Sequence, residues 1–433
     1  MEQSRKEYSL KIKLMTNTKK SILKIFQSNL LAITCLLLFA TSAVGQGYED
    51  SLTAQLTRLH QKSDLPGFAV AIVSKQKVMY QNGFGYSDLA TKTPYTTETL
   101  QNVGSISKTF IAFALMKLVE EGKLKLDDNI EDYLSFKITN PYFPNNKVTI
   151  RQLATHTSSL TDGKDEMLIE KSYLLHEKTS FTREELPKGY FECFELYNTN
   201  EPMSMKQFLY NTYCKEGDWY SQDNFLNTPP GTIYEYTNIG ATLLAYIIEG
   251  VAEEPFDQFI QKSVLQPLSM NESAWSWSGI DSASNRITHY LPNNLAVPSY
   301  DLITYPDGGF ITNISEFTHY LREMIKGLNG ESELLKQEFY KEMMSNQLTK
   351  EYFPSADFLR PRGLLWTSNK EGDNISANGA GPGVTTTCML TTGGNIGYVF
   401  FINKSIYDNE KGEQAFREIR QLLIKYAGKI RRE

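Results

Sequence analysis

The stretch Gly104-Ser105-Ile106-Ser107-Lys108-Thr109-Phe110 decides the fold, because it places a serine and a lysine three residues apart at the start of an apolar segment. Side chains at positions i and i+3 share one face of a helix, so the Ser105 hydroxyl is expected beside the Lys108 amine. The partial positive charge of a helix N-terminus and desolvation both disfavour a protonated amine, which makes it a usable base. This arrangement is typical of an activated serine nucleophile.

The residues that follow predict a buried central helix that ends at Gly122, since they are apolar on nearly every side: Ile111, Phe113, Leu115, Met116, Leu118 and Val119. The Ser-x-x-Lys spacing also begins at Ser21 and at Ser74. However, Ser21 lies in a basic leader and Ser74 in a strand-turn segment. Ser105 is therefore the candidate nucleophile.

A second motif, Tyr236-Thr237-Asn238, precedes another apolar segment that runs from Ile239 to Glu249 and is followed by Gly250. The tyrosine phenol can carry a proton, and the asparagine amide can hold a lysine or a substrate amide. A helix cap with a packed tyrosine is the alternative interpretation. The same spacing occurs at Tyr80-Gln81-Asn82, where the following Gly83 predicts a hairpin turn.

Together, Ser105-Ile106-Ser107-Lys108 and Tyr236-Thr237-Asn238 resemble the first two motifs of the serine beta-lactamase and penicillin-binding protein superfamily, in its class C-like branch of beta-lactamase-related hydrolases. The resemblance runs from about residue 50 to the C-terminus. Further segments resemble the family in the family's order: Leu65–Val73, Val148–Ser159 and Tyr305–Gly309.

The third motif departs from the family. The family carries Lys-Thr-Gly or His-x-Gly on a strand, and the matching segment here, Ser376–Gly383, has Ala377 where the basic residue is expected. A methyl group neither polarises the tyrosine nor attracts a carboxylate. The resemblance still assigns the oxyanion hole to the backbone N–H groups of Ser105 and Ala380, and substrate binding to Asn378 and Gly379. The alternative for this stretch is a glycine-rich turn between strands.

The resemblance implies an α/β (α+β) chain with the beta-lactamase/DD-peptidase-like fold. It implies an antiparallel sheet flanked by helices, with a sheet lobe from about 46–125 and 296–433 and an inserted helical lobe from about 126–295. Composition favours strands near 67–73, 77–80, 388–392 and 396–402, the last two joined as a hairpin by Gly393-Gly394-Asn395. Helical spacing of apolar residues predicts that residues 413–426 pack across the sheet.

Residues 1–45 combine seven basic residues with an apolar run from Leu30 to Ala40, which predicts a secretory signal peptide cleaved before Gln46. We therefore expect a periplasmic or secreted protein with no stable membrane insertion after cleavage. The alternative is an uncleaved anchor, for which the run is short. The chain has 44 basic and 50 acidic residues and a net charge of −6, a balance that argues against a nucleic-acid partner.

No His, Cys and carboxylate cluster has metal-ligand spacing, so neither a metal nor another cofactor is expected.

Trp219 and Tyr220 are candidates for the cleft wall because they lie near the second motif, although packing is the commoner role of such residues. His156 is expected to be structural rather than catalytic. Beyond the leader, Cys193 and Cys214 can pair or all three cysteines can be free thiols.

The function expected from these residues is an exported serine hydrolase that acts through an acyl-enzyme on an ester, amide or D-amino-acid peptide bond. Its partner is then a small-molecule or peptide substrate, and the sequence leaves the oligomeric state undefined. Ala377 favours a neutral ester or amide over a substrate whose carboxylate must be held. The alternative is a catalytically impaired homologue that binds cell-wall or peptide ligands.

Overall fold

The computed structural model describes residues 47–164, 167–281, 285–348, 361–369, 373–391, 393 and 395–430. The expected signal peptide, residues 1–45, and its cleavage site lie outside these residues. The chain divides into two compact units, Leu56–Ala427 and a smaller one made of Met1–Gln55 and Gly428–Glu433. In the smaller unit, residues 47–55 are helical, and the Lys429 ammonium lies 5.2 Å from the centroid of the Tyr48 ring.

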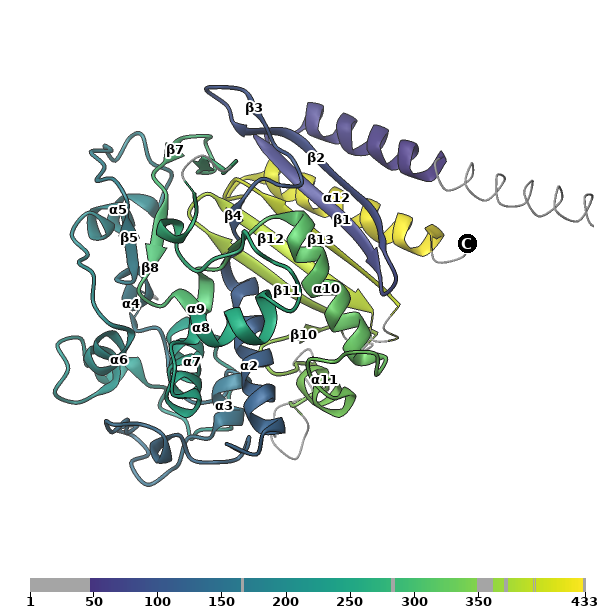
Figure 1. Ribbon diagram of the computed structural model, residues 1–433. Helices are drawn as coiled ribbons and strands as arrows, with labels where there is room; N and C mark the ends of the chain where they lie inside the picture. Colours follow the sequence, from purple (N-terminus) through teal and green to yellow (C-terminus); the bar gives the residue numbers. More distant parts are fainter. Residues whose placement is uncertain are drawn as a thin grey trace, which may run out of the picture. The chain divides into compact units, whose positions relative to one another are not determined.

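The chain forms short strands and helices, most of which are labelled in Figure 1. The strands are β1 (Gly67–Ser74), β2 (Val78–Asp88), β3 (Thr93–Pro94), β4 (Gln101–Asn102), β5 (Tyr173–Leu175), β6 (His289–Tyr290), β7 (Ala296–Val297), β8 (Tyr300–Leu302), β9 (Ile311–Thr312), β10 (Thr367–Ser368), β11 (Asn374–Gly381), β12 (Val384–Thr391) and β13 (Ile396–Ile402). The helices are α2 (Lys108–Glu120), α3 (Ile150–Ala154), α4 (Met167–Glu170), α5 (Tyr190–Tyr197), α6 (Met205–Tyr213), α7 (Asn238–Ala252), α8 (Phe256–Ile260), α9 (Tyr305–Gly308), α10 (Ile314–Leu328), α11 (Gln337–Met344) and α12 (Glu410–Ile430).

The main sheet has seven strands in the order β10-β11-β12-β13-β1-β2-β3, and every neighbouring pair is antiparallel. Strands from the two ends of the sequence meet where β13 pairs with β1 (Figure 1). The predicted hairpin is confirmed, since Leu390 of β12 pairs with Gly397 of β13. An antiparallel sheet built from both ends of the chain, as the sequence predicted, is therefore present.

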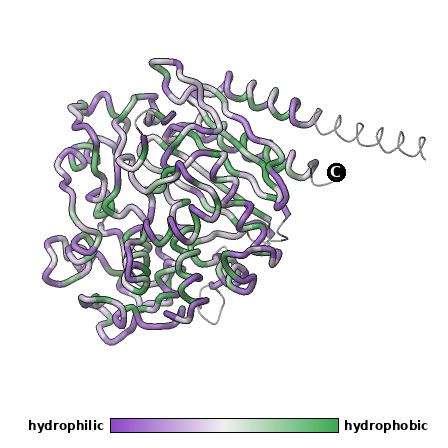
Figure 2. Tube along the Cα trace, viewed as in Figure 1, coloured by the Kyte–Doolittle hydropathy of each residue, from purple (hydrophilic) through white to green (hydrophobic). Residues whose placement is uncertain are grey.

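Helices cover both faces of this sheet because its central strands are apolar on both sides. Consecutive side chains of a strand point to opposite faces. Phe401 of β13 meets the Phe317 ring of α10 at 5.6 Å between centroids, whereas the adjacent Phe400 meets Phe416 of α12 at 5.0 Å. Figure 2 shows the apolar stretches along β1 and β13 that these layers bury. The predicted packing of the tail helix on the sheet is confirmed.

Helix α2 is the buried central helix that the sequence predicted. Ten of its thirteen residues are buried, and Phe110 stacks on Tyr320 with 4.2 Å between ring centroids. Helices α3 to α8 all lie between residues 150 and 260, inside the segment expected to form the helical lobe. Cys193, Cys214 and Cys388 are free thiols.

One local prediction is wrong. Tyr80-Gln81-Asn82-Gly83 does not form a hairpin turn but lies inside β2, where Gly83 pairs with Ala69. Glycine is needed there because the chain crosses closely above it. A Cβ at position 83 would lie 2.8 Å from the Thr96 Cα.

We expect Phe401→Ala to lower the free energy of unfolding by about 3–5 kcal/mol, because it opens a cavity between the sheet and α10. Ile424→Ala, at a half-exposed position of α12, is the control and should cost roughly 0.5 kcal/mol or less. Denaturant unfolding of both variants measures the difference. Equal stabilities would contradict the packing described for β13.

Candidate active site

Ser105 and Lys108 meet at the start of α2, as their spacing predicted. A short 3₁₀ turn, Gly104–Ser107, leads into the helix and brings the Lys108 Nζ to 3.0 Å from the Ser105 Oγ. Lys108 is only 2% exposed. Ser107, by contrast, has a structural role: its hydroxyl donates to the Gly104 carbonyl and accepts from the Phe310 N–H.

The second motif completes this group from α7. The Tyr236 hydroxyl donates to the Ser105 Oγ over 2.8 Å, and the Asn238 Oδ1 accepts from the Lys108 Nζ over 2.8 Å. Thr237 caps the helix, since its hydroxyl accepts from the Gly240 N–H. The motif thus caps a helix and also supplies polar groups to the serine.

A buried carboxylate that the sequence analysis missed, Asp162, holds this motif in place. It accepts from the backbone N–H groups of Asn238 and Ile239 and from the Asn238 Nδ2 over 2.8–2.9 Å. Because a carboxylate only accepts hydrogen bonds, this contact turns the amide so that its oxygen faces Lys108. The negative charge also lies at the N-terminus of α7, where the helix dipole stabilises it.

The hydrogen bonds of Lys108 define what its amine can do. Besides Ser105 and Asn238, its Nζ donates to the Asp307 carbonyl oxygen over 2.7 Å. Those two oxygens can only accept, whereas the Ser105 hydroxyl can donate or accept. A neutral amine that gives its two hydrogens to Asn238 and Asp307 therefore directs its lone pair at the Ser105 proton. This geometry suits a general base.

Asp307 is buried beneath the site on α9. Its side chain accepts from the Thr242 hydroxyl over 2.7 Å. Burial raises the pKa of the Asp307 carboxyl to about 6, while the nearby Lys108 charge and the Thr242 hydrogen bond act in the opposite direction. Burial dominates because a charge removed from water loses more than these partners return.

His156 supports Tyr236 and does not contact the serine in the described structure. The two rings lie 4.6 Å apart between centroids, and the imidazole Nδ1 accepts from the Thr237 N–H at 3.4 Å. Burial lowers the pKa of His156 to about 3, and the charges of Lys108 and Arg362 act in the same direction. The ring is therefore neutral at pH 7, which suits the structural role expected from the sequence.

The third motif lies on β11, and only its end forms the glycine-rich turn at Pro382-Gly383. Ala377 is 8% exposed and pairs with Cys388 of β12, whereas Asn378 is exposed. The backbones of β11 and the 3₁₀ turn lie so close that a Cβ on Gly104 would approach the Ala380 nitrogen to 2.6 Å. Gly104 also has φ of +56°, which favours glycine.

These elements border a cavity of about 480 Å³. The predicted residues Ser105, Tyr236, Asn238, Asn378, Gly379 and Ala380 all line it. Acidic and aromatic side chains that the sequence analysis missed complete the wall: Glu170, Tyr173, Tyr300, Asp307 and Tyr407. They come from distant segments of the chain, so no local motif could reveal them.

Trp219 and Tyr220 are not among the described residues that line this cavity. The Trp219 ring packs edge-on against Phe208 at 5.3 Å, and the Tyr220 ring lies 6.0 Å from Phe225. Both thus take the packing role that was the alternative in the sequence. Lys108 lines a second cavity of about 60 Å³ beside Ser105, together with Ala377 and Arg362.

The described residues contain no group of three or more His, Cys, Asp or Glu side chains arranged to hold a metal ion. Among the same residues, no helix has the length and hydropathy needed to span a bilayer.

The chain is similar to known proteins along most of its length. Residues 52–423 match the family described as Beta-lactamase. Protein flp of Staphylococcus aureus is 23% identical over 282 residues, which are 64% of this chain and 49% of that protein. The chain thus spans about half the length of this relative.

Solved structures share the fold at low sequence identity. The octameric penicillin-binding protein homologue from Pyrococcus abyssi matches with a TM-score of 0.61 and 22% identity, over 82% of this chain and 73% of that one. A class C beta-lactamase matches with a TM-score of 0.60 and 18% identity, over 88% and 96% of the two chains. The resemblance to this fold that the sequence indicated is confirmed.

The raised pKa of Asp307 predicts a pH-dependent stability. Its carboxyl holds a proton more tightly in the folded chain, about 6, than at the ordinary value of 3.8. The stability that this group confers is therefore full below pH 4 and falls by roughly 3 kcal/mol as the pH rises to 6 and above. Asp307→Asn should remove this slope in denaturant unfolding between pH 4 and 7.

Asp128→Asn is the matched control, because hydrogen bonds from Tyr133 and the Lys125 N–H lower the pKa of that exposed carboxyl. Its contribution should change in the opposite sense, with stability lost as the pH falls below about 4. An unchanged slope in Asp307→Asn would contradict the burial argument for Asp307.

Proposed function

The chain belongs to the beta-lactamase family, and from this we propose that it is a serine hydrolase that works through an acyl-enzyme on an ester, amide or D-amino-acid peptide bond. One observation carries the proposal. The Ser105 Oγ lies 3.0 Å from the Lys108 Nζ and 2.8 Å from the Tyr236 hydroxyl. A nucleophile and its proton acceptors are thus within hydrogen-bonding reach.

In the proposed reaction, the Ser105 Oγ forms a bond to the substrate carbonyl carbon while its proton passes to the Lys108 amine. The tetrahedral intermediate then loses its leaving group, and Tyr236 relays the proton from Lys108 to that group. Water attacks the acyl carbon while the same groups accept its proton. The ester bond to the Ser105 Oγ then breaks, that proton returns to the Oγ, and the acid product is released. Asn238 holds Lys108 in position throughout.

The negative charge of the intermediate needs hydrogen-bond donors. We assign this role to the backbone N–H groups of Ser105 and Ala380, which the close approach of Gly104 to β11 supports. On β11, strand β10 pairs with Ile375 and Ser376. The stretch Asn378–Ala380 therefore continues past its partner strand and borders the larger cavity, where it can align a substrate.

The competing proposal is a catalytically impaired homologue that binds cell-wall or peptide ligands. The methyl group of Ala377 in place of a cation favours it. The intact contacts among Ser105, Lys108, Tyr236 and Asn238 favour the hydrolase.

We expect a fluorophosphonate probe to add a single covalent label to the chain, at Ser105. Ser105→Ala should abolish labelling and leave the unfolding midpoint nearly unchanged, because the side chain is partly exposed. Ser107→Ala is the matched control and should keep the label while losing stability, since it leaves the buried Phe310 N–H without its acceptor. Intact mass and peptide mapping decide. An unlabelled native chain, or a label elsewhere, would contradict the proposed nucleophile.

Export is part of this proposal and rests on the composition of residues 1–45. We expect the exported protein to begin near Gln46, because the apolar run has the length of a signal peptide and is too short for a typical membrane span. N-terminal sequencing of the exported protein tests this. Recovery of the intact leader in the membrane fraction would contradict it.

A further inference from the structure

The smaller cavity beside Ser105 has two basic side chains in its wall, Lys108 and Arg362. Among the described residues that line it, none has an acidic side chain. His156, which also lines it, is neutral at pH 7. Since the Lys108 amine is committed to Ser105, Asn238 and the Asp307 carbonyl, Arg362 is the cation that remains available.

Arg362 has hydrogen-bonding capacity that the protein does not use. Its guanidinium stacks on the Tyr234 ring at 4.0 Å, and its Nη1 donates to the Thr367 hydroxyl over 3.1 Å. Its Nε is buried and has no hydrogen-bond partner in the described structure. No carboxylate of the described residues forms an ion pair with it. A buried donor without an acceptor is costly, so this group is suited to an acceptor from outside the chain.

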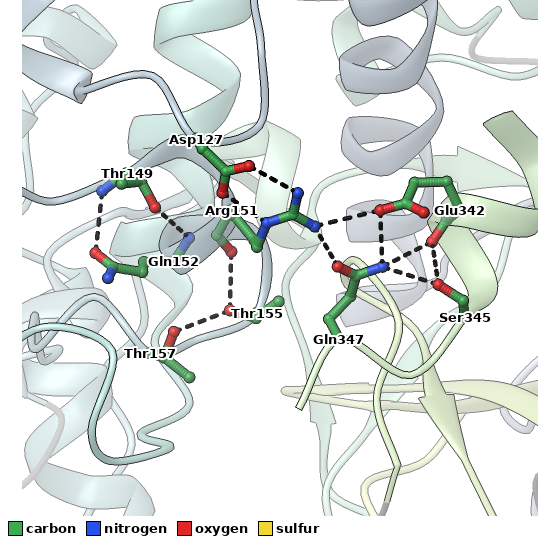
Figure 3. A network of polar contacts seen from close by, with 9 residues as sticks. All are labelled: Asp127, Thr149, Arg151, Gln152, Thr155, Thr157, Glu342, Ser345 and Gln347. Carbon is green, nitrogen blue, oxygen red and sulfur yellow. Dashed lines mark hydrogen bonds and ion pairs between the residues drawn. The ribbon is translucent and has the colours of Figure 1, made fainter. Parts of the chain in front are cut away.

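The backbone holds Arg362 firmly at this position. Arg362 forms a bridge with Thr367, which in turn pairs with Ser376 of β11. Its carbonyl oxygen accepts from the Gln347 N–H over 2.7 Å. The Gln347 side chain belongs to a polar network around Arg151 that Figure 3 shows.

That network links three separate segments of the chain. Arg151 forms ion pairs with Asp127 and Glu342, and its carbonyl oxygen accepts from the Thr155 hydroxyl (Figure 3). Thr155 lines the same small cavity as Arg362. The backbone of Arg362 is thus tied to this network through Gln347. Groups fixed in this way bind ligands with little loss of entropy.

Resting on the proposed function, we propose that Arg362 supplies the positive charge that Ala377 lacks, and that it selects substrates with a carboxylate on the leaving group. The two residues line one cavity, and the small Ala377 side chain leaves room beside the guanidinium. A planar guanidinium can bind a carboxylate through two parallel hydrogen bonds. The leaving-group side is favoured because Tyr236, which delivers the proton to that group, lines the cavity too.

This placement revises the expectation of a neutral substrate, which assumed that no other cation reaches the site. It also divides two roles that the family combines in the third motif. The backbone of β11 aligns the substrate, whereas the positive charge comes from the segment that precedes β10.

The test compares 3-acetoxybenzoate with its methyl ester. Both carry the same acetyl group, and their leaving groups bear a carboxylate in the first and an uncharged methyl ester in the second. Arg362→Ala should lower kcat/KM for the carboxylate by about tenfold or more and for the methyl ester by roughly threefold or less. Arg362→Lys should retain part of the preference, since it keeps the charge without the planar donors. Arg417→Ala, which removes an exposed arginine of α12, is the control and should change neither rate.

A second variant moves the positive charge from position 362 to position 377. Ala377→Lys should restore the preference for the carboxylate in the Arg362→Ala variant. In the native chain it should give no gain, because it adds a cation beside Arg362 in one small cavity. Two results would overturn the proposal. One is an equal loss of kcat/KM for both esters in Arg362→Ala, and the other is an unchanged preference for the carboxylate in that variant.

A binding measurement keeps this inference separate from the hydrolase proposal. In the Ser105→Ala variant, calorimetry should show tighter binding of 3-acetoxybenzoate than of its methyl ester, and Arg362→Ala should remove the difference. If the native chain hydrolyses neither ester, the proposed function fails while this arm still tests Arg362. Equal binding of the two esters to Ser105→Ala would overturn the role of Arg362.

Discussion

The contact between the buried Asp162 carboxylate and Asn238 is the interaction on which the rest of the site depends. It binds two backbone N–H groups at the start of α7 and turns the Asn238 amide toward Lys108. With its amide reversed, Asn238 would present hydrogens to an amine that must itself donate, and the lone pair of Lys108 would lose its direction. The geometry at Ser105 thus depends on a carboxylate that does not contact the serine in the described structure.

The parts of this molecule that the sequence predicted are those encoded by short-range patterns. Ser105 and Lys108 meet because three residues separate them, and the apolar spacing of α12 placed it on the sheet. The sequence did not predict the roles of Asp162, Asp307 and Arg362. Their contacts join segments that are far apart along the chain, and such contacts leave no periodic pattern in the sequence. Trp219 lies near the second motif in sequence, yet its ring packs on Phe208, since proximity along the chain does not determine direction. Gly83 resembled a turn residue, but its missing side chain serves a close crossing of the backbone.

The position of Arg362 shows how a site can keep its charge while one of its motifs loses it. Ala377 belongs to the apolar side of β11, packed toward Cys388, and a long cation at that place would share the cavity with Lys108. A guanidinium carried on the preceding segment approaches the same cavity from another direction, stacked on Tyr234 and tied to the Arg151 network. The charge of a site depends on the side chains that reach its cavity, and these can come from different segments of the chain.

The narrow gap between Gly104 and the backbone of β11 has a consequence for how this chain can vary. The groups that we assign to the oxyanion belong to the main chain, so substitutions of neighbouring side chains leave their chemistry intact. Only the two glycines that permit the close approach, Gly104 and Gly379, are sterically intolerant there, since any Cβ would push the helix and the strand apart. Substitutions can therefore change the side chains that line the cleft, and with them the substrate that it accepts. The backbone N–H groups that we assign to the oxyanion stay in place.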